Sequence, residues 1–200
     1  MVDKRPAGSG TGAIYGGAAQ ERPLPMTPGA IHEEHPFRPP PEQRDPVRRL
    51  RGRLVAPVTI ITAGTDEAAW TGLTVSSLVV SEGSPPLVYC LLGPTTDLIE
   101  RIAETERFLV HVCEAEHRRL ADVFAGIEPS PGGMFTGRKA TQTDHGPRLE
   151  GFPATAGCTV VSGREESYNV LVTARIDEVS ADELTDPLTY FRGGYRTLGD

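Results

Sequence analysis

The chain has 200 residues and a mass of 21.5 kDa, which is enough for one domain of ordinary size with a tail. It carries 20 Lys and Arg against 27 Asp and Glu, and thinly spread basic residues on an acidic chain argue against nucleic-acid binding. No apolar run approaches the roughly 18 residues of a membrane span, and the first residues lack the apolar core of a secretory signal. Its three cysteines are too few and too scattered for a disulfide framework or a metal site, so we expect a cytoplasmic protein without a metal.

Composition divides the chain near residue 46. Nine of the 18 prolines lie in residues 1–46, together with several glycines. Proline removes backbone donors and glycine raises the entropy cost of ordering. We therefore expect residues 1–45 to form a flexible Pro/Gly-rich arm and residues 46–200 to form the folded domain. Within the arm, residues 32–35 (His-Glu-Glu-His) are interpreted as a solvated charge cluster, because no third or fourth metal ligand lies nearby.

The first part of the domain is predicted to start with a short helix and to continue as strands. The helix begins at Pro46 and ends near Gly52. The β-branched residues of 58–62 predict a strand, and alternation over 70–80 predicts a long second strand that forms a hairpin with it. Further strands are expected at 86–92, 108–112, 156–162 and 170–179, with a short closing pair at 188–191 and 195–198.

Two helices and a long loop complete the prediction. Residues 97–102 repeat at helical spacing behind Thr95 or Thr96 as the cap, and residues 114–124 form a second amphipathic helix. Residues 126–153 are rich in Gly, Pro and Thr and are predicted to be a loop. Strands mostly in hairpins, with inserted helices, predict a mainly β fold: a closed antiparallel barrel with peripheral helices.

Few residues suggest chemistry on their own. Asp144 and His145 are either a catalytic pair or an exposed turn, and the turn is favoured. His111 alternates with apolar strand residues, which predicts a satisfied core histidine, and Cys90 and Cys113 lie in apolar strands, which predicts inert thiols.

Two hydroxyl clusters are the stronger candidates. One is Thr74-Val75-Ser76-Ser77, within the predicted second strand, and the other is Thr95-Thr96, before a helix. Hydroxyls and free N–H groups at a helix start bind anions, whereas the alternative is a plain threonine N-cap. On these residues alone the cap is favoured.

Several segments together resemble the flavin reductase-like family, whose fold is the FMN-binding split barrel. The resemblance covers residues 47–198. It rests on the segments Leu54–Thr62 (LVAPVTIIT), Gly72–Ser77 (GLTVSS), Pro85–Val88 (PPLV), Phe108–Val112 (FLVHV), Leu120–Gly126 (LADVFAG) and Pro187–Arg196 (PLTYFRGGYR), which occur in the order of the family's motifs.

The resemblance implies a homodimer with one FMN near each subunit boundary, FAD being the alternative flavin, and NADH or NADPH as co-substrate. The reduced flavin would serve a partner monooxygenase, with no role for nucleic acid or a membrane. The cofactor-binding residues that it implies are Val58, Thr59, Thr74, Val75, Ser76, Ser77, Thr95, Thr96 and Phe124. The protein would hold the flavin where a nicotinamide can stack on it.

The chain departs from the family pattern on the nicotinamide side. Where many members carry Gly-Asp-His, this chain reads Ser167-Tyr168-Asn169, so Asn169 stands in place of the histidine. A basic residue near the phosphate loop is replaced by Gly93-Pro94, and a following threonine by Asp97. Two alternatives to a flavin reductase therefore stay open: an FMN-binding protein without nicotinamide turnover, and an oxidoreductase whose other substrate contacts Tyr168 and Asn169.

Overall fold

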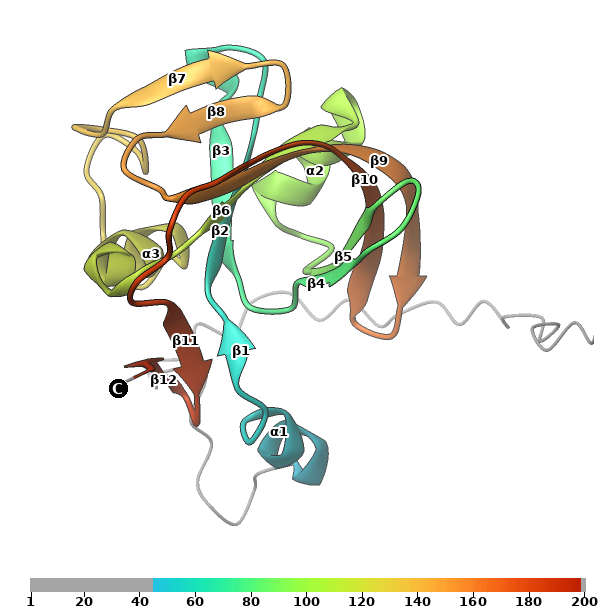
Figure 1. Ribbon diagram of the computed structural model, residues 1–200, viewed down its shortest axis with the longest axis vertical. Helices are drawn as coiled ribbons and strands as arrows, with labels where there is room; N and C mark the ends of the chain where they lie inside the picture. The colour runs from blue at the N-terminus through green and yellow to red at the C-terminus, as the bar shows by residue number, and fades with distance from the viewer. Residues whose placement is uncertain (1–44, 199–200) are drawn as a thin grey trace, which may run out of the picture. The chain divides into compact units, whose positions relative to one another are not determined.

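The computed structural model describes residues 45–198 (Figure 1). The predicted arm and the His32–His35 cluster lie outside the described residues. The first helix, α1 (Pro46–Arg51), confirms the expectation for this segment. The Asp45 side chain caps it by accepting a 2.8 Å hydrogen bond from the Val47 amide, and Gly52 ends it. None of its residues is buried.

The main structure is a seven-stranded sheet in which every neighbouring pair is antiparallel. In spatial order its strands are β3 (Thr71–Val75), β2 (Thr59–Ala63), β6 (Arg107–Val112), β9 (Ala154–Glu166), β10 (Asn169–Ala181), β5 (Leu87–Leu92) and β4 (Val79–Ser81).

The chain connection between the two edge strands forces this sheet to curl. A flat sheet of seven strands would separate its edges by about 29 Å. However, β3 and β4 are joined only by residues 76–78, so the chain from Val75 to Val79 spans at most about 14 Å. The edges come close without pairing, which gives a split barrel. The prediction of one continuous strand over 70–80 is wrong, because the chain leaves one edge at Ser76 and joins the other at Val79.

Smaller elements surround the barrel. A second sheet has the order β1 (Ala56–Pro57), β11 (Leu188–Phe191) and β12 (Gly194–Thr197), the last two confirming the predicted closing pair. The helices are α2 (Asp97–Thr105) and α3 (Arg118–Phe124), with 3-10 turns at Glu67–Ala69 and Ala115–His117. None of the helices in residues 45–198 has the length and the apolar character that a membrane span requires.

The segment predicted as a long loop contains a hairpin. Strands β7 (Ala140–Thr143) and β8 (Gly146–Leu149) pair with each other and not with the barrel. Two buried side chains hold β8 against the barrel strands instead. Thr62 donates a 2.6 Å hydrogen bond to the Pro147 carbonyl, and the Leu149 amide donates to His111 Nε2 at 3.0 Å. Polar strand residues and a proline concealed this hairpin from periodicity analysis.

Two hydrophobic clusters lie on opposite sides of β2. Ile61 belongs to the cluster that includes Leu98 and Ile102 of α2, and Ile60 belongs to the cluster that includes Phe124 of α3. Because both faces of β2 are covered, its five residues are all buried. His111 is fully buried, and burial lowers its pKa to about 4, which confirms a neutral core histidine.

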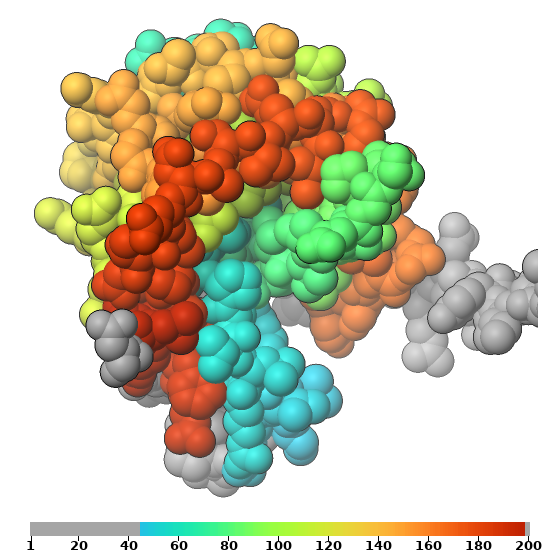
Figure 2. Space-filling view, viewed as in Figure 1, coloured from blue at the N-terminus to red at the C-terminus, as the bar shows by residue number. Residues whose placement is uncertain are grey.

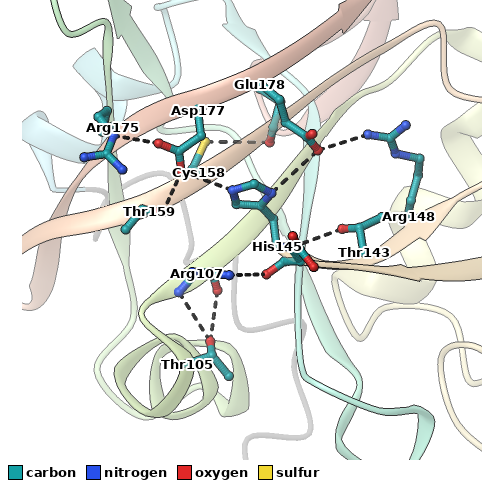
Figure 3. A network of polar contacts seen from close by, with 12 residues as sticks. Thr105, Arg107, Thr143, His145, Arg148, Cys158, Thr159, Arg175, Asp177 and Glu178 are labelled. Atoms are coloured by element: carbon teal, nitrogen blue, oxygen red, sulfur yellow. Dashed lines mark hydrogen bonds and ion pairs between the residues drawn. The ribbon is translucent and has the colours of Figure 1, made fainter.

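His145 anchors the β7–β8 turn to the barrel (Figure 3). The predicted turn is confirmed, with Asp144 exposed. However, His145 Nε2 lies 3.1 Å from Asp177 Oδ2 and its side chain is only 11% exposed, so the prediction of exposure is wrong for His145. Asp177 also accepts hydrogen bonds from Thr159 at 2.5 Å and Arg175 at 2.6 Å. Burial opposes ionisation of this carboxyl, but these three hydrogen bonds prevail and hold its pKa at about 2.

A bulge and a glycine make room for this contact. The β9–β10 pairing skips Asp177, because Ile176 pairs with Cys158 and Glu178 pairs with Gly157. A bulge redirects a side chain, here toward His145. A Cβ on Gly157 would lie 2.5 Å from His145 Nδ1, so the imidazole occupies the space of the missing side chain.

Replacing Gly157 with alanine should displace His145 and loosen the β7–β8 hairpin. We expect a loss of about 1–3 kcal/mol in the free energy of unfolding, the usual cost of overpacking. Urea denaturation measures this loss, and amide exchange over residues 140–149 should accelerate. Gly163→Ala is the matched control on the same strand, because a Cβ there would lie 3.7 Å from Val170 Cγ1, an ordinary van der Waals contact. Equal stability of the two variants would contradict this account.

Candidate functional site

The Gly72–Ser77 segment interlocks with α3. A Cβ on Gly72 would lie 2.6 Å from the Phe124 ring, so this glycine lets the ring pack directly on β3. Two residues further along, the Thr74 hydroxyl donates a 2.7 Å hydrogen bond to the Ala121 carbonyl. The Thr74 hydroxyl proton, predicted to serve a cofactor, is therefore used inside the protein.

Ser77 joins the same segment to β5. Its Oγ donates to the Leu91 carbonyl at 2.8 Å and accepts from the Leu91 amide at 3.2 Å. Strand β4 begins at Val79, so its backbone pairing with β5 does not reach Leu91. The two bonds of Ser77 take the place of that pairing. Ser77 thereby sets the position where the chain crosses the opening of the barrel.

Within the two predicted hydroxyl clusters, the hydroxyls of Ser76 and Thr95 have no partner in the described chain. No hydrogen bond is formed by the Ser76 hydroxyl on the crossing segment or by the exposed Thr95 hydroxyl before α2 within residues 45–198. Thr96, by contrast, caps α2: its Oγ1 lies 3.4 Å from the Ile99 amide and donates to the Gly93 carbonyl at 3.0 Å. Thr96 is thus a helix cap, which confirms the prediction of a threonine N-cap for this residue. Thr95 is the threonine available to a ligand.

Strand register brings the predicted nicotinamide-side residues to this region. Val170 of β10 pairs with Leu92 of β5, so Asn169 begins β10 next to the Gly93–Thr96 turn. Tyr168 lies in the two-residue turn between β9 and β10 and is 83% exposed. The fold therefore gathers Ser76, Thr95, Tyr168 and Asn169 around the ends of β5 and β10.

Other predicted site residues lie deeper. Val58, Thr59 and Phe124 are each 1% exposed, and Val75 is also buried. The Thr59 hydroxyl donates to the Val75 carbonyl at 2.8 Å, across the β2–β3 pair. The structure thus places these four side chains in the supporting layer, where they fix the backbone of the candidate site.

The charge of the candidate site is negative. The segments 74–78, 91–100 and 167–171 contain no Lys or Arg, and their only charged residues are Asp97 and Glu100 in the first turn of α2. Acidic residues there favour the helix dipole, but they oppose an anionic ligand at the same turn. A flavin phosphate therefore needs positive charge from outside these segments.

Sequence reasoning missed a contact that joins two of the motifs. Burial raises the pKa of Tyr195, in the Pro187–Arg196 motif, and the negative charge of Asp122 on α3 raises it further. Arg118 lies over the Tyr195 ring at 5.9 Å. Nothing in the local sequence pattern distinguishes Asp122. Only the packing of α3 against the Pro187–Arg196 motif shows that Asp122 lies near Tyr195.

The remaining candidates are structural. Burial raises the pKa of Cys90, Cys113 and Cys158 to about 12, so these thiols stay protonated, in agreement with the prediction of inert thiols for the first two. A surface hollow of about 550 Å³ lies between α3 and residues 128–138. Its Arg119 is paired with Glu128, and none of its lining residues belongs to the candidate site.

Comparison with known proteins agrees with this fold and these motifs. The sequence profile of the flavin reductase like domain matches residues 51–199, so the chain belongs to that family. A homologue of nitrilotriacetate monooxygenase component B from Mycobacterium thermoresistibile has a crystal structure with a TM-score of 0.69. It is 25% identical, and the match covers 76% of this chain and 85% of that chain. The family resemblance and the split-barrel prediction are confirmed.

Two relatives are named as reductases. An NADH-dependent FAD reductase from Streptomyces globisporus is 33% identical over 92 residues, 46% of this chain and half (50%) of that protein's length. The FMN reductase (NADH) RutF of Cronobacter sakazakii is 25% identical over 151 residues, 76% of this chain and 90% of that protein.

Ser77 forms two hydrogen bonds and Ser76 forms none within residues 45–198, so alanine substitution should affect the two positions differently. Ser77→Ala leaves the Leu91 amide and carbonyl without their side-chain partner, so we expect a loss of about 1–3 kcal/mol in the free energy of unfolding. Ser76→Ala removes a hydroxyl that has no partner in the described chain and should change stability little. Chemical denaturation of both variants measures the difference. Equal losses would show that Ser77 does not hold the crossing segment.

Proposed function

We propose that this protein is an NADH-dependent flavin reductase that binds flavin along residues 74–77 and 95–96. The observation that carries the proposal is the pair of unpartnered hydroxyls, Ser76 and Thr95, on two segments that Ser77 ties together. Family membership and the relatives' reductase names support the same reaction. FMN is the proposed flavin and FAD the alternative, because the relatives divide between the two.

The chain offers a flavin two kinds of contact. Thr95 and the free amides at the start of α2 would bind a phosphate, since a nine-residue helix presents both N–H groups and its dipole there. Ser76 and the backbone of the crossing segment would hydrogen-bond the ring and its side chain. A bound flavin supplies the ability to accept a hydride from a reduced nicotinamide. The protein's task is to orient the two rings and limit the access of water.

Asn169 and Tyr168 are the residues we assign to the nicotinamide side. Asn169 can hydrogen-bond a carboxamide or a sugar, but only as a neutral group. Tyr168 presents an exposed aromatic surface on which a planar ring can stack. Because neither residue carries a charge, we expect a slow reductase.

The setting of the reaction is part of the proposal. A homodimer is supported by exposed apolar residues around the site, including Leu91 and Tyr168. Reduced flavin would pass to a partner monooxygenase, as the name of the similar monooxygenase component suggests. Three free cysteines favour a reducing compartment such as the cytoplasm. Residues 1–45 are proposed to be a separate arm.

Asn169 favours a second candidate function. Without a histidine at this position, the protein would bind FMN but not turn over nicotinamide, or would reduce another small substrate near Tyr168. The two candidates differ in their response to a nicotinamide, and one assay separates them.

We expect NADH to bleach the visible absorbance of FMN under anaerobic conditions, with NADPH less effective.

We also expect Asn169→His to raise kcat/KM for NADH several-fold, about 1 kcal/mol of transition-state stabilisation, because histidine can carry charge near neutral pH. Asn169→Gln is the control that keeps an amide. Flavin binding without bleaching in both the wild type and Asn169→His would reject the reductase and support a binding protein.

Thr95 and Thr96 should separate ligand binding from folding. Thr95→Ala removes a hydrogen bond to a charged group, worth about 1.5–3 kcal/mol, so FMN affinity should fall at least about tenfold at unchanged stability. Thr96→Ala removes the cap of α2 and should cost about 1 kcal/mol of folding stability. Flavin titration and thermal unfolding give both quantities. Unchanged affinity in Thr95→Ala would exclude this phosphate site.

A further inference from the structure

Residues 46–55, hereafter the basic segment, have nearly all of their side chains exposed within the described chain. Its apolar side chains Val47, Leu50, Leu54 and Val55 are 60–71% exposed. A six-residue helix is too short to be stable by itself in water, so such a surface requires a covering partner. Backbone contacts connect the segment to the body: the Arg192 amide donates to the Gly52 carbonyl at 3.0 Å, and β1, which follows the segment, pairs with β11.

The charge of the basic segment is unusual for this acidic chain. It contains four arginines and no acidic residue, although the chain as a whole has a net charge of −7. Arg49, Arg51 and Arg53 are exposed, and no ion pair or hydrogen bond engages their side chains within residues 45–198. Three guanidinium groups are therefore free to meet carboxylates of another molecule.

Three carboxylates near the candidate site lack a partner in the same way. Asp97, Glu100 and Glu165 are exposed and form no ion pair within the described residues, whereas the neighbouring Glu104 and Glu166 are paired with Arg101 and Arg164. Glu165 pairs with Val170, and Val170 pairs with Leu92, five residues before Asp97. Glu165 therefore lies at the sheet end from which the chain continues into α2, whose first turn carries Asp97 and Glu100. These three residues are hereafter the acidic edge.

The acidic edge is flanked by exposed apolar side chains. Tyr168 is 83% exposed and Val161 is 60% exposed, both on the β9–β10 hairpin. This combination matches the basic segment in both properties: unpaired charges of opposite sign, and apolar groups beside them.

The two surfaces do not cover each other in one chain. Figure 1 shows α1 and the β9–β10 turn separated, with both directed toward the same end of the molecule. In Figure 2 the basic segment, in blue and cyan, projects below the body, while the β9–β10 hairpin, in orange, forms a separate projection beside it. A two-fold axis between two copies pairs each surface with its counterpart, as an isologous interface requires.

We propose that the basic segment of one chain docks on the acidic edge of a second copy, with Arg49, Arg51 and Arg53 facing Asp97, Glu100 and Glu165. The occupant is a second copy because the chain itself carries both complementary surfaces. The pairing rests on the proposed homodimer, and it adds a contribution to the site. Arginines from the partner would supply the positive charge that the segments around Thr95 lack, so the phosphate of a flavin would meet a neutralised helix start.

Charge reversal tests the pairing. Arg51→Glu/Arg53→Glu and Asp97→Arg/Glu100→Arg should each raise the dimer dissociation constant at least ~100-fold, because like charges then face each other. Arg119→Glu/Lys139→Glu makes the same charge change as the first variant on α3 and the following loop, and should leave dimerisation unchanged. Sedimentation velocity at low ionic strength measures all three, and salt should weaken the wild-type dimer.

Mixing the two reversed variants is the decisive step. Each should be monomeric alone, and a mixture carrying different tags should form a mixed dimer, because the reversed charges complement each other across one of the two contacts. Glu165→Arg is the second variant, in case reversal at the start of α2 impairs folding, and circular dichroism verifies each fold. A wild-type monomer, unaffected dimers in the reversed variants, or failure of the mixture to pair would each overturn the proposal.

Flavin reduction measured on the same samples keeps this proposal separate from the proposed function. Reduction of FMN by NADH in a wild type that fails the pairing tests would reject only the interface. Correct pairing without any reduction would reject only the reductase.

Discussion

Residues 76–78 connect strands that lie at opposite edges of a seven-stranded sheet, and this short connection determines the rest of the structure. It closes the barrel, because three residues cannot reach between the edges of a flat sheet. It also exposes backbone and hydroxyl groups at the opening, where the chain follows neither edge. The side-chain bonds of Thr74 to α3 and Ser77 to β5 hold the crossing in place from both sides.

The candidate site depends on which hydroxyl groups of the two clusters are used inside the fold. Thr74, Ser77 and Thr96 form hydrogen bonds inside the fold, whereas Ser76 and Thr95 form none within residues 45–198 and are the hydroxyls proposed to bind a ligand. The buried residues behind them, such as Thr59 and Phe124, keep the crossing segment rigid without presenting any surface of their own. A site arranged in this way is organised before a ligand arrives, which reduces the entropy cost of binding.

Local patterns predicted the elements that depend on local chemistry. Pro46 and Gly52 bounded the first helix, Thr96 capped α2, and β-branched residues marked β2. The errors occurred where distant contacts decide the structure. Nothing near Ser76 indicates that the chain changes sheet edge there, because the sequence over 70–80 alternates as a strand would. Similarly, β8 is held by Thr62 and His111, which lie far from it in sequence. The order of six weak motifs identified the fold. Only the structure shows that, within residues 45–198, Ser76 and Thr95 are the hydroxyls without a hydrogen bond.

Gly157 and His145 share one volume, although they belong to different strands and different hairpins. The two positions therefore cannot vary independently: a smaller residue at 145 leaves a void unless 157 gains a side chain, and a larger residue at 157 needs a shorter one at 145. This packing of His145 against Gly157 fixes where the β7–β8 hairpin docks on the barrel, because no backbone pairing joins the two. Among related chains, the size of the residue at 157 should report whether the hairpin docks in the same place.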